Sequence, residues 1–398
     1  MKILVLNAGS SSIKYKLFNM DGPTVIAAGR VERIGEEQGA VRHAVPGRQA
    51  VRAERPIPAH RDGLEEVVRL LLDRETGVIE RPDDVAAVGH RVVHGGERFS
   101  EPAVIDAAVL AAVRELIPLA PLHNPANLAG IEVASELFPE AVQVAVFDTA
   151  FHQTLPPHAY RYALPNELYE EDGIRVYGFH GTSHQYVARE AARHLGLTTE
   201  HGNLITLHLG NGASITAVAG GRSVDTSMGF SPLPGLVMGT RSGDVDPAVV
   251  FHLARERGMS VDEIDALLNK RSGLLGLCGE NDLRDIEARM DAGDAAARLA
   301  FEVYVYRIRK YIGAYTAVLG RVDALVFTAG VGENSAAVRA AVCAGLEGLG
   351  YRLDPEKNAA GRTGSVTEIH APGSAAGILI VATDEELEIA VETAGLAA

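Results

Sequence analysis

Three short segments place an arginine or a histidine among glycines. They are GHRVVHGG at 89–96, GFHGTSH at 178–184 and GTRSGDVDP at 239–247. Glycine allows a ligand to approach the backbone closely, and arginine and histidine donate hydrogen bonds to anionic oxygens. The first segment follows an apolar run at 85–88, and ligand contacts in open α/β sheets lie just past strand ends. We therefore expect Arg91, His180 and Arg241 to contact an anionic substrate.

Each assignment has an ordinary structural alternative. Arg91 could lie in a loop, where it is solvated or paired with Glu97. The GFHGTSH segment could be a helix start that Thr182 or Ser183 caps, because serine and threonine are favoured at that position. Such a cap would leave a role for His180 open.

Carboxylates stand at two further element ends. Asp148 follows the apolar strand expected at 141–147, where it is either a helix cap or a metal ligand. Asp384, Glu385 and Glu386 come after the strand expected at 377–381 and begin the last helix. The residues themselves leave open which of these acids would bind a metal.

Two similar strand–turn–strand units would position these groups. An apolar run at 3–6, a polar turn from Asn7 to Ser12 and an alternating strand at 13–17 form the first unit. A strand at 204–209, a turn at 210–214 and a strand at 215–218 form the second. Backbone N–H groups and hydroxyls in such turns suit phosphate oxygens. The repeat indicates two related halves with a phosphate chain between their turns.

A third strand, expected at 322–327, runs into a glycine-rich turn with Gly330, Val331 and Gly332, and then into a helix. Strand, glycine-rich turn and helix form a nucleotide-binding arrangement. No GxxxxGK[ST] segment is present, which argues against a P-loop. The glycine patterns match the dinucleotide fingerprint only in part, so a Rossmann dehydrogenase fits poorly.

Composition limits the class of protein. The 398 residues suit two domains, and the net charge of −15 argues against a nucleic-acid partner. The two cysteines lie far apart in no ligand spacing, which fits a reducing compartment. The apolar run at the N-terminus is too short for a signal peptide, and no run reaches membrane-spanning length. We expect a cytoplasmic protein with no membrane partner.

Capping residues and apolar periodicity predict the main helices. The expected helix starts are Asp62 with Glu65 at the third helical position, Asn124 as a cap before Pro125, Asp246 before Pro247, and Asp282. Further helices are expected at 105–116, 185–195 and 295–319, and a domain boundary is expected near residue 150.

The hairpins and the glycine-rich loop resemble the superfamily of actin, sugar kinases and heat-shock chaperone ATPases. Within it, the chain is similar to the acetate kinase family in LVLNAGSSSIKYKLF, GHRVVHGGE, FDTAFH, GFHGTSH, LHLGNGAS, DTSMGFSPLPGLVMGTRSGDVDP, FTAGVGENS and TDEE, in this order over residues 3–386. The resemblance implies an α/β, two-domain, actin-like ATPase fold with a duplicated ribonuclease H-like core. The expected domains are 1–150, joined by the helix at 386–398, and 151–385.

The resemblance also implies a chemistry: reversible transfer of the ATP γ-phosphoryl group to acetate, giving acetyl phosphate and ADP with Mg²⁺ or Mn²⁺. Acetate is ionised at neutral pH, so the reaction needs cations and donors around the phosphoryl group rather than a general base. Arg91, Arg241 and His180 match the family's catalytic cations. Asp148 and Glu385 match its metal carboxylates, with Asn7 in the first turn beside them. Asp148 is also expected among the catalytic residues, where it positions and neutralises rather than abstracts a proton.

The remaining matched positions fall into two groups. The residues expected at the ATP phosphates and adenosine are Asn7, Ser10, Ser12, Lys14, His208, Leu209, Gly210, Asn211, Gly212, Asp282, Leu283, Arg284, Gly330, Val331, Gly332 and Asn334. The residues expected at the acetyl group are Arg91, Val93, Leu122, Phe179 and Pro232.

The sequence also allows functions other than acetate phosphorylation. A propionate or butyrate kinase would differ by one or two methylenes, which an apolar pocket distinguishes by only about 1–3 kcal/mol. An actin-like protein or an ATP-binding regulator would need no such set of cations. The family suggests a homodimer through the second domain, and the two turns suggest closure over the substrates.

Overall fold

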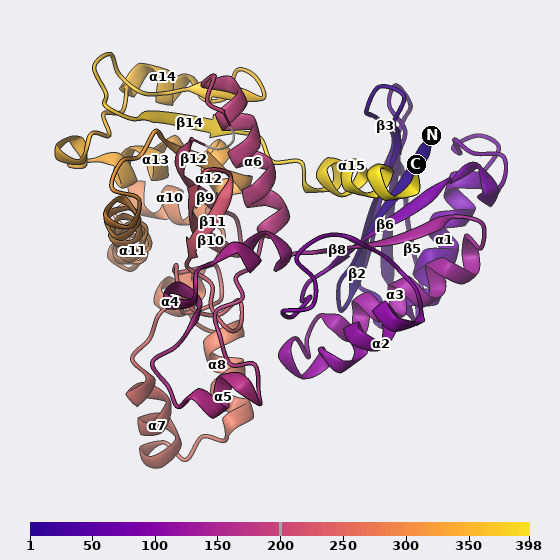
Figure 1. The fold of residues 1–398 in the computed structure, drawn as a ribbon, viewed down its shortest axis with the longest axis horizontal. Helices are drawn as coiled ribbons and strands as arrows, with labels where there is room; N and C mark the ends of the chain where they lie inside the picture. The colour runs from indigo at the N-terminus through magenta and orange to yellow at the C-terminus, as the bar shows by residue number, and fades with distance from the viewer. Residues whose placement is uncertain (199–200) are drawn as a thin grey trace. The chain divides into compact units, whose positions relative to one another are not determined.

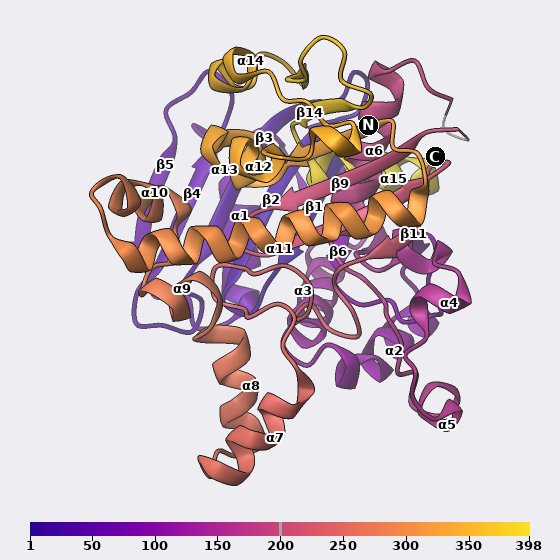
Figure 2. The ribbon, with the colours of Figure 1, turned by 90° about the vertical axis from the view of Figure 1, so that its left-hand side faces the viewer.

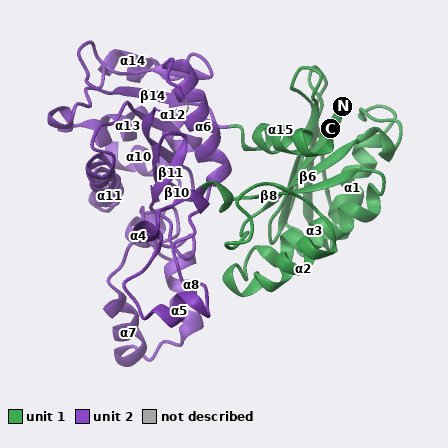
Figure 3. Ribbon diagram, viewed as in Figure 1, with its two compact units in different colours: residues 1–151, 384–398 green, residues 152–383 purple. Residues whose placement is uncertain are grey.

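A computed structural model describes residues 1–198 and 201–398. The chain divides into two compact units (Figure 1, Figure 3). Unit 1 comprises Met1–Phe151 and Asp384–Ala398, and unit 2 comprises His152–Thr383. Each unit is built around one β-sheet. In the described part of the chain, no helix has both the length and the apolar composition needed to cross a membrane.

Unit 1 contains an eight-stranded sheet in the order β5-β4-β3-β2-β1-β6-β8-β7. Its strands are β1 (Lys2–Ala8), β2 (Ser12–Asn19), β3 (Thr24–Glu32), β4 (Gly39–Ala44), β5 (Val51–Arg55), β6 (Ala87–Val92), β7 (Ala103–Val104) and β8 (Val142–Phe147). Strands β1 to β5 form an antiparallel meander, and β6 and β8 run parallel to β1. The predicted first hairpin is confirmed, because β1 and β2 pair from Lys2 with Asn19 to Ala8 with Ile13.

Helices cover both faces of this sheet. They are α1 (His60–Leu72), α2 (Ala107–Glu115), α3 (Asn124–Leu137) and α15 (Glu385–Ala397), with short 3-10 turns at Pro82–Asp84, Ile117–Leu119 and Ala150–Thr154. Side chains alternate along a strand, so Leu4 packs in the core under α1 and α3 while Ile3 packs under α15. Ile389 and Ala390 of α15 complete that second core.

Unit 2 contains a six-stranded sheet in the order β11-β10-β9-β12-β14-β13. Its strands are β9 (Asn203–Leu209), β10 (Ala213–Ala219), β11 (Arg222–Thr226), β12 (Ala324–Thr328), β13 (Val366–Glu368) and β14 (Gly377–Val381). The antiparallel strands β9 to β11 and the parallel strands β12 and β14 repeat the arrangement of β1 to β3 with β6 and β8. The predicted second hairpin and the duplicated core are therefore confirmed.

The helices of unit 2 also lie on both faces of its sheet. Figure 1 and Figure 2 show the long helix α11 (Ala295–Leu319) along one face, and α6 (Gly181–His194) lies on the other. The others are α4 (Pro157–Tyr160), α5 (Asn166–Glu170), α7 (Pro247–Glu256), α8 (Val261–Lys270), α9 (Gly273–Cys278), α10 (Leu283–Asp291), α12 (Ala329–Asn334), α13 (Ala336–Cys343) and α14 (Pro355–Ala360), with a 3-10 turn at Glu347–Leu349.

Two predicted caps in unit 1 are wrong by one or more residues. Helix α1 begins at His60, and Asp62 lies in its first turn and accepts a hydrogen bond from the Ala59 N–H. Helix α3 begins at Asn124 itself. The Asn124 side chain is instead hydrogen bonded to both backbone groups of His94, so tertiary structure uses its amide. The predicted caps Asp246 and Asp282 are confirmed.

Two predictions in unit 2 are also wrong. Neither Thr182 nor Ser183 caps α6, which begins at Gly181 behind His180 in the left-handed conformation (φ 57°). The glycine-rich turn expected after β12 is the helix α12. Ala329 has a positive φ of 63°, which redirects the chain so that a helix starts directly after the strand.

Candidate active site

The first turn presents its polar groups at one end of the unit 1 sheet. Asn7 on β1 lies opposite Lys14 on β2, and Ser10 and Ser12 lie in or directly after the turn. The Gly9 N–H donates to the Ser12 carbonyl at 2.8 Å, which closes the turn. The four residues predicted for this turn are thus together at the end of one hairpin.

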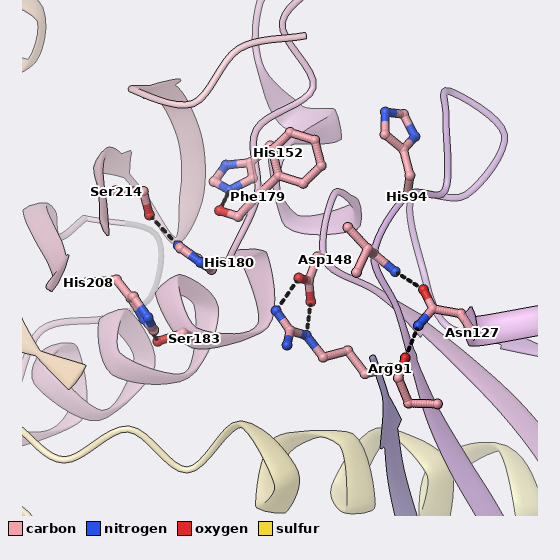
Figure 4. Close-up of polar contacts among 12 residues, drawn as sticks. Arg91, His94, Asn127, Asp148, His152, Phe179, His180, Ser183, His208 and Ser214 are labelled. Atoms are coloured by element: carbon pink, nitrogen blue, oxygen red, sulfur yellow. Dashed lines mark hydrogen bonds and ion pairs between the residues drawn. The ribbon is translucent and has the colours of Figure 1, made fainter. Parts of the chain in front are cut away.

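Asn127 connects this hairpin to the strand that carries Arg91. Its Nδ2 donates to the Ala8 carbonyl at 2.7 Å, and its Oδ1 accepts from the Val93 N–H at 3.0 Å (Figure 4). Sequence reasoning missed Asn127. An amide among the apolar positions of a helix, next to Leu128 and Ile131, is the signal that could have found it, because a buried amide needs specific partners.

Arg91 and Asp148 form a bidentate ion pair in unit 1 (Figure 4). Arg91 lies within β6 rather than in a loop, and Asp148 follows the neighbouring strand β8. Nε and Nη2 of Arg91 donate to the two carboxylate oxygens at 2.9 and 2.6 Å. The Asp148 side chain is 2% exposed and that of Arg91 is 21% exposed, so the guanidinium keeps access to a ligand.

Glu385 lies beside this pair at the start of α15. The pKa of Glu385 is raised to about 7, chiefly because burial disfavours its charged form; Arg91 and Lys14 lower this pKa, and the charges of Asp148 and Glu386 raise it. The local cations therefore do not offset the combined effect of burial and two neighbouring carboxylates. An added cation would favour the ionised form of Glu385.

The neighbouring acids are engaged elsewhere. Lys16 Nζ lies 2.9 Å from Asp384 Oδ1 and 3.1 Å from Glu386 Oε2. Asp384 also caps α15 through the Leu387 N–H, as predicted. Among the three acids at this helix start, Glu385 is the one that neither pairs with Lys16 nor caps the helix in these contacts.

The second turn lies in unit 2, between β9 and β10. The Gly210 N–H donates to the Gly212 carbonyl at 3.1 Å. A Cβ on Gly212 would lie 3.5 Å from His180 Nε2 and 3.6 Å from Arg241 Nη1. Asn211 stands between the two glycines. The predicted imidazole and guanidinium thus converge on this turn.

A network of buried hydroxyls surrounds His180. Its Nδ1 lies 2.9 Å from Ser214 Oγ, and its ring stacks on that of His208 with centroids 4.2 Å apart. Nδ1 of His208 lies 2.8 Å from Ser183 Oγ (Figure 4). Ser183 and Ser214 were not among the predicted site residues.

Arg241 lies in a loop whose two ends, Gly235 and Asp244, are joined by a hydrogen bond. This junction is called the neck of the loop. Its Nη1 donates to the Pro232 carbonyl at 3.1 Å, and burial lowers its pKa. At the neck, Asp244 Oδ1 accepts from the Gly235 N–H at 2.8 Å. Helix α11 holds this neck, because Tyr311 donates to Asp244 Oδ2 at 2.8 Å and Arg307 Nη1 donates to the Gly235 carbonyl at 3.0 Å.

A cavity of about 610 Å³ adjoins the second turn within unit 2, a size that suits a nucleotide. Eight residues predicted for ATP line it: Gly210, Asn211, Asp282, Leu283, Arg284, Gly330, Val331 and Asn334. Five others were not predicted: Gly239, Leu274, Asn281, Glu287 and Ser335. The predicted nucleotide segments, far apart in sequence, therefore meet at one cavity.

Two predicted ATP residues, Leu209 and Gly332, are buried beside this cavity rather than in its lining. Arg339, which sequence reasoning missed, fixes the helix that lines it. The Arg339 side chain is fully buried, and Nη1 donates to the carbonyls of Gly332 and Glu333 at 2.9 and 3.0 Å. Its Nε donates to Asn358 Oδ1 at 2.8 Å.

The residues predicted for the acetyl group are distributed over both units. Val93 and Leu122 belong to unit 1, where Leu122 is 51% exposed. Phe179 and Pro232 belong to unit 2, where Phe179 is buried and Pro232 accepts the bond from Arg241. An acetyl pocket from these four residues stays a prediction.

Comparison with known proteins identifies the class. The model of the acetokinase family matches residues 2–391. The acetate kinase of Streptomyces coelicolor is 57% identical over 396 residues, which cover 99% of this chain and 97% of that protein. The acetate kinase of Oleidesulfovibrio alaskensis is 53% identical over 394 residues, 98% of each chain.

Solved structures of acetate and propionate kinases have the same fold as this chain. The crystal structure of Porphyromonas gingivalis acetate kinase has a TM-score of 0.95 and 47% identity, with both chains covered completely. A propionate kinase from Francisella tularensis has a TM-score of 0.93 and 43% identity, with 99% of each chain covered. The chain belongs to the acetokinase family. The predicted fold class and enzyme class, a phosphotransferase with a carboxyl acceptor, are confirmed.

Proposed function

We propose that this chain transfers the ATP γ-phosphoryl group directly to acetate by in-line displacement, giving acetyl phosphate and ADP. The observation that carries the proposal is the second turn. It borders a nucleotide-sized cavity on one side and faces His180 and Arg241 at Gly212 on the other. A triphosphate that follows the turn would meet donors where charge develops in the transition state.

The acceptor needs no base, because acetate is already ionised at neutral pH. The barrier comes from bringing two anions together, which positive charge and hydrogen-bond donors lower. Arg241 and His180 would act on the transferring phosphoryl group at the Gly212 turn. Arg91, oriented by Asp148, would bind the acetate carboxylate through its remaining donors.

Magnesium fits the carboxylates of unit 1. In the described residues, no cluster of three or more His, Cys, Asp or Glu side chains forms a ready-made metal site. Asp148, Glu385 and the Asn7 amide would instead share the ion with phosphate oxygens, as is usual for Mg²⁺. The buried carboxyl of Glu385 beside Asp148 supports this, because a bound cation would offset the burial that disfavours its ionised form. When bound, Mg²⁺ or Mn²⁺ would neutralise phosphate charge.

Acetate is the favoured acceptor over propionate or butyrate. The relatives at 57% and 53% identity are acetate kinases, whereas the propionate kinase is 43% identical. Val93 is the position to compare, since a smaller side chain there would admit a longer acyl chain. A homodimer and a cytoplasmic location remain part of this proposal.

The test is acyl phosphate formation, trapped with hydroxylamine, for acetate, propionate and butyrate side by side. Wild type and Arg241→Ala are measured together. We expect acetate to be preferred and the variant to lose at least about 100-fold in kcat, the effect of removing one transition-state donor. Butyrate turnover equal to that of acetate would reassign the acceptor. ATP binding without acyl phosphate from any acid would support a regulator instead.

A further inference from the structure

His180 and His208, at the second turn, each have a hydrogen bond between Nδ1 and a serine hydroxyl. Nδ1 of His180 meets Ser214 Oγ at 2.9 Å, and Nδ1 of His208 meets Ser183 Oγ at 2.8 Å. Both serines are fully buried. Each imidazole is therefore hydrogen bonded through the same nitrogen to a hydroxyl that solvent does not reach.

The opposite nitrogens face the glycines of the turn. Nε2 of His180 lies 3.5 Å from the position of a Cβ on Gly212. Nε2 of His208 lies 3.8 Å from the position of a Cβ on Gly210. Each ring thus spans the distance from a buried serine to the proposed phosphate position.

Each serine hydroxyl has a second hydrogen-bond partner. Ser214 Oγ also lies 2.7 Å from Nε2 of His184, whose Nδ1 lies 2.7 Å from Thr206 Oγ1. Ser183 Oγ also lies 2.9 Å from Thr383 Oγ1. Burial, with smaller effects of His152 and His208, holds the pKa of His184 well below its usual value, so this imidazole is neutral.

A neutral imidazole has one donor and one acceptor nitrogen. If Nε2 of His184 donates to Ser214, the Ser214 hydroxyl donates to Nδ1 of His180. A neutral His180 then carries its proton on Nε2, towards the turn. The reverse direction would place the Nε2 lone pair against phosphate oxygens, which is repulsive. The same reasoning applies to His208 when Ser183 accepts from Thr383.

A second proton on His180 is disfavoured by its surroundings. The guanidinium of Arg241 approaches the same Gly212 position at 3.6 Å, and the ring of His208 stacks on that of His180. His184 stands behind Ser214. A further positive charge here would be repelled by Arg241, whereas a neutral Nε2–H can donate to the phosphate oxygens without that repulsion.

We propose that Ser214 and Ser183 are positioning residues that hold His180 and His208 as neutral Nε2–H tautomers. Both rings then donate to the phosphate chain without becoming imidazolium ions. This rests on the proposed function in placing the phosphate chain at the turn. The hydrogen-bond network of unit 2 allows these tautomers, and the phosphate oxygens expected at the turn select them over the reverse direction.

The pH dependence of kcat separates this role from a merely structural one. In wild type, a neutral donor keeps kcat from falling as pH rises past the ordinary imidazole pKa of about 6.5. In Ser214→Ala, only the imidazolium form is certain to donate. We expect kcat of the variant to fall about 3- to 10-fold more than that of wild type between pH 6 and pH 8.5, the effect of one hydrogen bond.

Ser223→Ala is the matched control. Ser223 Oγ bonds Nδ1 of His152 at 2.8 Å, but Nε2 of His152 bonds the Phe179 carbonyl instead of facing the turn. This variant loses the same kind of buried bond and should keep the wild-type pH profile. A Ser214→Ala profile parallel to wild type would overturn the proposal.

Nitrogen-15 NMR of histidine-labelled enzyme with ADP gives a readout that needs no turnover. The His180 signals are identified by their loss in His180→Gln. We expect a protonated Nε2 and an unprotonated Nδ1 in wild type at pH 7.5. An Nδ1–H tautomer or an imidazolium would contradict the proposal even if Ser214→Ala were unstable. A failed acetate assay with the expected spectrum would count against the function, not the tautomer.

Discussion

Arg91 donates two hydrogen bonds, from Nε and Nη2, to the two oxygens of Asp148, a carboxylate that is almost fully buried. Removing one partner leaves the other without compensation. Arg91→Ala should lower the free energy of unfolding by about 3–5 kcal/mol, because it leaves an unpaired buried carboxylate. Arg91→Ala combined with Asp148→Ala should cost less than the sum of the single changes.

Urea unfolding of the four proteins measures this coupling. Arg98→Ala is the control, since Arg98 and Glu115 pair at 2.7 Å with both side chains 61% exposed. Such an exposed pair contributes about 0–1 kcal/mol. Additive effects of Arg91→Ala and Asp148→Ala would show that the pair does not act as a unit.

The raised pKa of Glu385 predicts a dependence of stability on pH. The carboxyl titrates near its usual value of 4.5 when unfolded and at about 7 when folded. Between these values the folded state binds the extra proton, so stability is lost as pH rises through this window and is level above it. Compared with Glu385→Gln, wild type should lose up to about 3 kcal/mol between pH 5 and pH 8.

Unfolding of both proteins without metal, at pH 5, 6, 7 and 8, tests this window. The difference between wild type and variant removes the contributions of other titrating groups. A constant difference across the four pH values would mean that Glu385 titrates normally in the folded protein.

Replacing Gly239 by alanine should raise the KM for ATP. It lines the cavity, and a Cβ there would clash with Oδ1 of Asn211 in the second turn. Gly239→Ala should therefore displace Asn211 and raise the KM for ATP about 10-fold or more, the effect of roughly one lost hydrogen bond. Gly313→Ala in α11 is the control, because its Cβ would meet no atom within 4 Å. An unchanged KM for ATP in Gly239→Ala would remove Asn211 from the phosphate site.

The hydrogen bond from Tyr311 to Asp244 at the neck of the Arg241 loop should affect kcat, although Tyr311 lies outside the loop. Tyr311→Phe removes the 2.8 Å bond to Asp244 and should loosen the loop. Loss of one hydrogen bond suggests a fall in kcat of about 3- to 10-fold with little change in the KM for ATP. Tyr306→Phe changes a tyrosine of the same helix that is 65% exposed and should be neutral. Equal kcat values for the two variants would show that α11 does not position Arg241.

Local sequence patterns predicted the main strands and helices. Alternation of apolar and polar residues located both hairpins, and the long helix was predicted at 295–319, the bounds that the structure shows. The starts of α6 and α12 were predicted wrongly, because the left-handed residues His180 and Ala329 have no side-chain signal for that conformation. Their glycine-rich surroundings, and then the motif resemblance, pointed to Arg91, Arg241 and His180.

Residues whose role depends on distant tertiary partners could not be predicted from the sequence. Arg339 stands in the sequence AAVRAAVC, where it resembles an exposed helical arginine, yet its acceptors come from two other helices. Tyr311 and Asp244 are separated by 67 positions. No local pattern specifies such pairs, because only the packing of distant elements brings them together.

The discontinuity of unit 1 sets the order in which the nascent chain can complete its parts. Strands β1, β6 and β8 emerge from the ribosome early, but α15, with Ile389 and Ala390 over Ile3 and Val5, is synthesised only after the whole of unit 2. The sheet of unit 1 therefore keeps one apolar face uncovered while unit 2 is made. A truncation before residue 385 would remove α15, expose the core of the unit made first and leave it prone to aggregation.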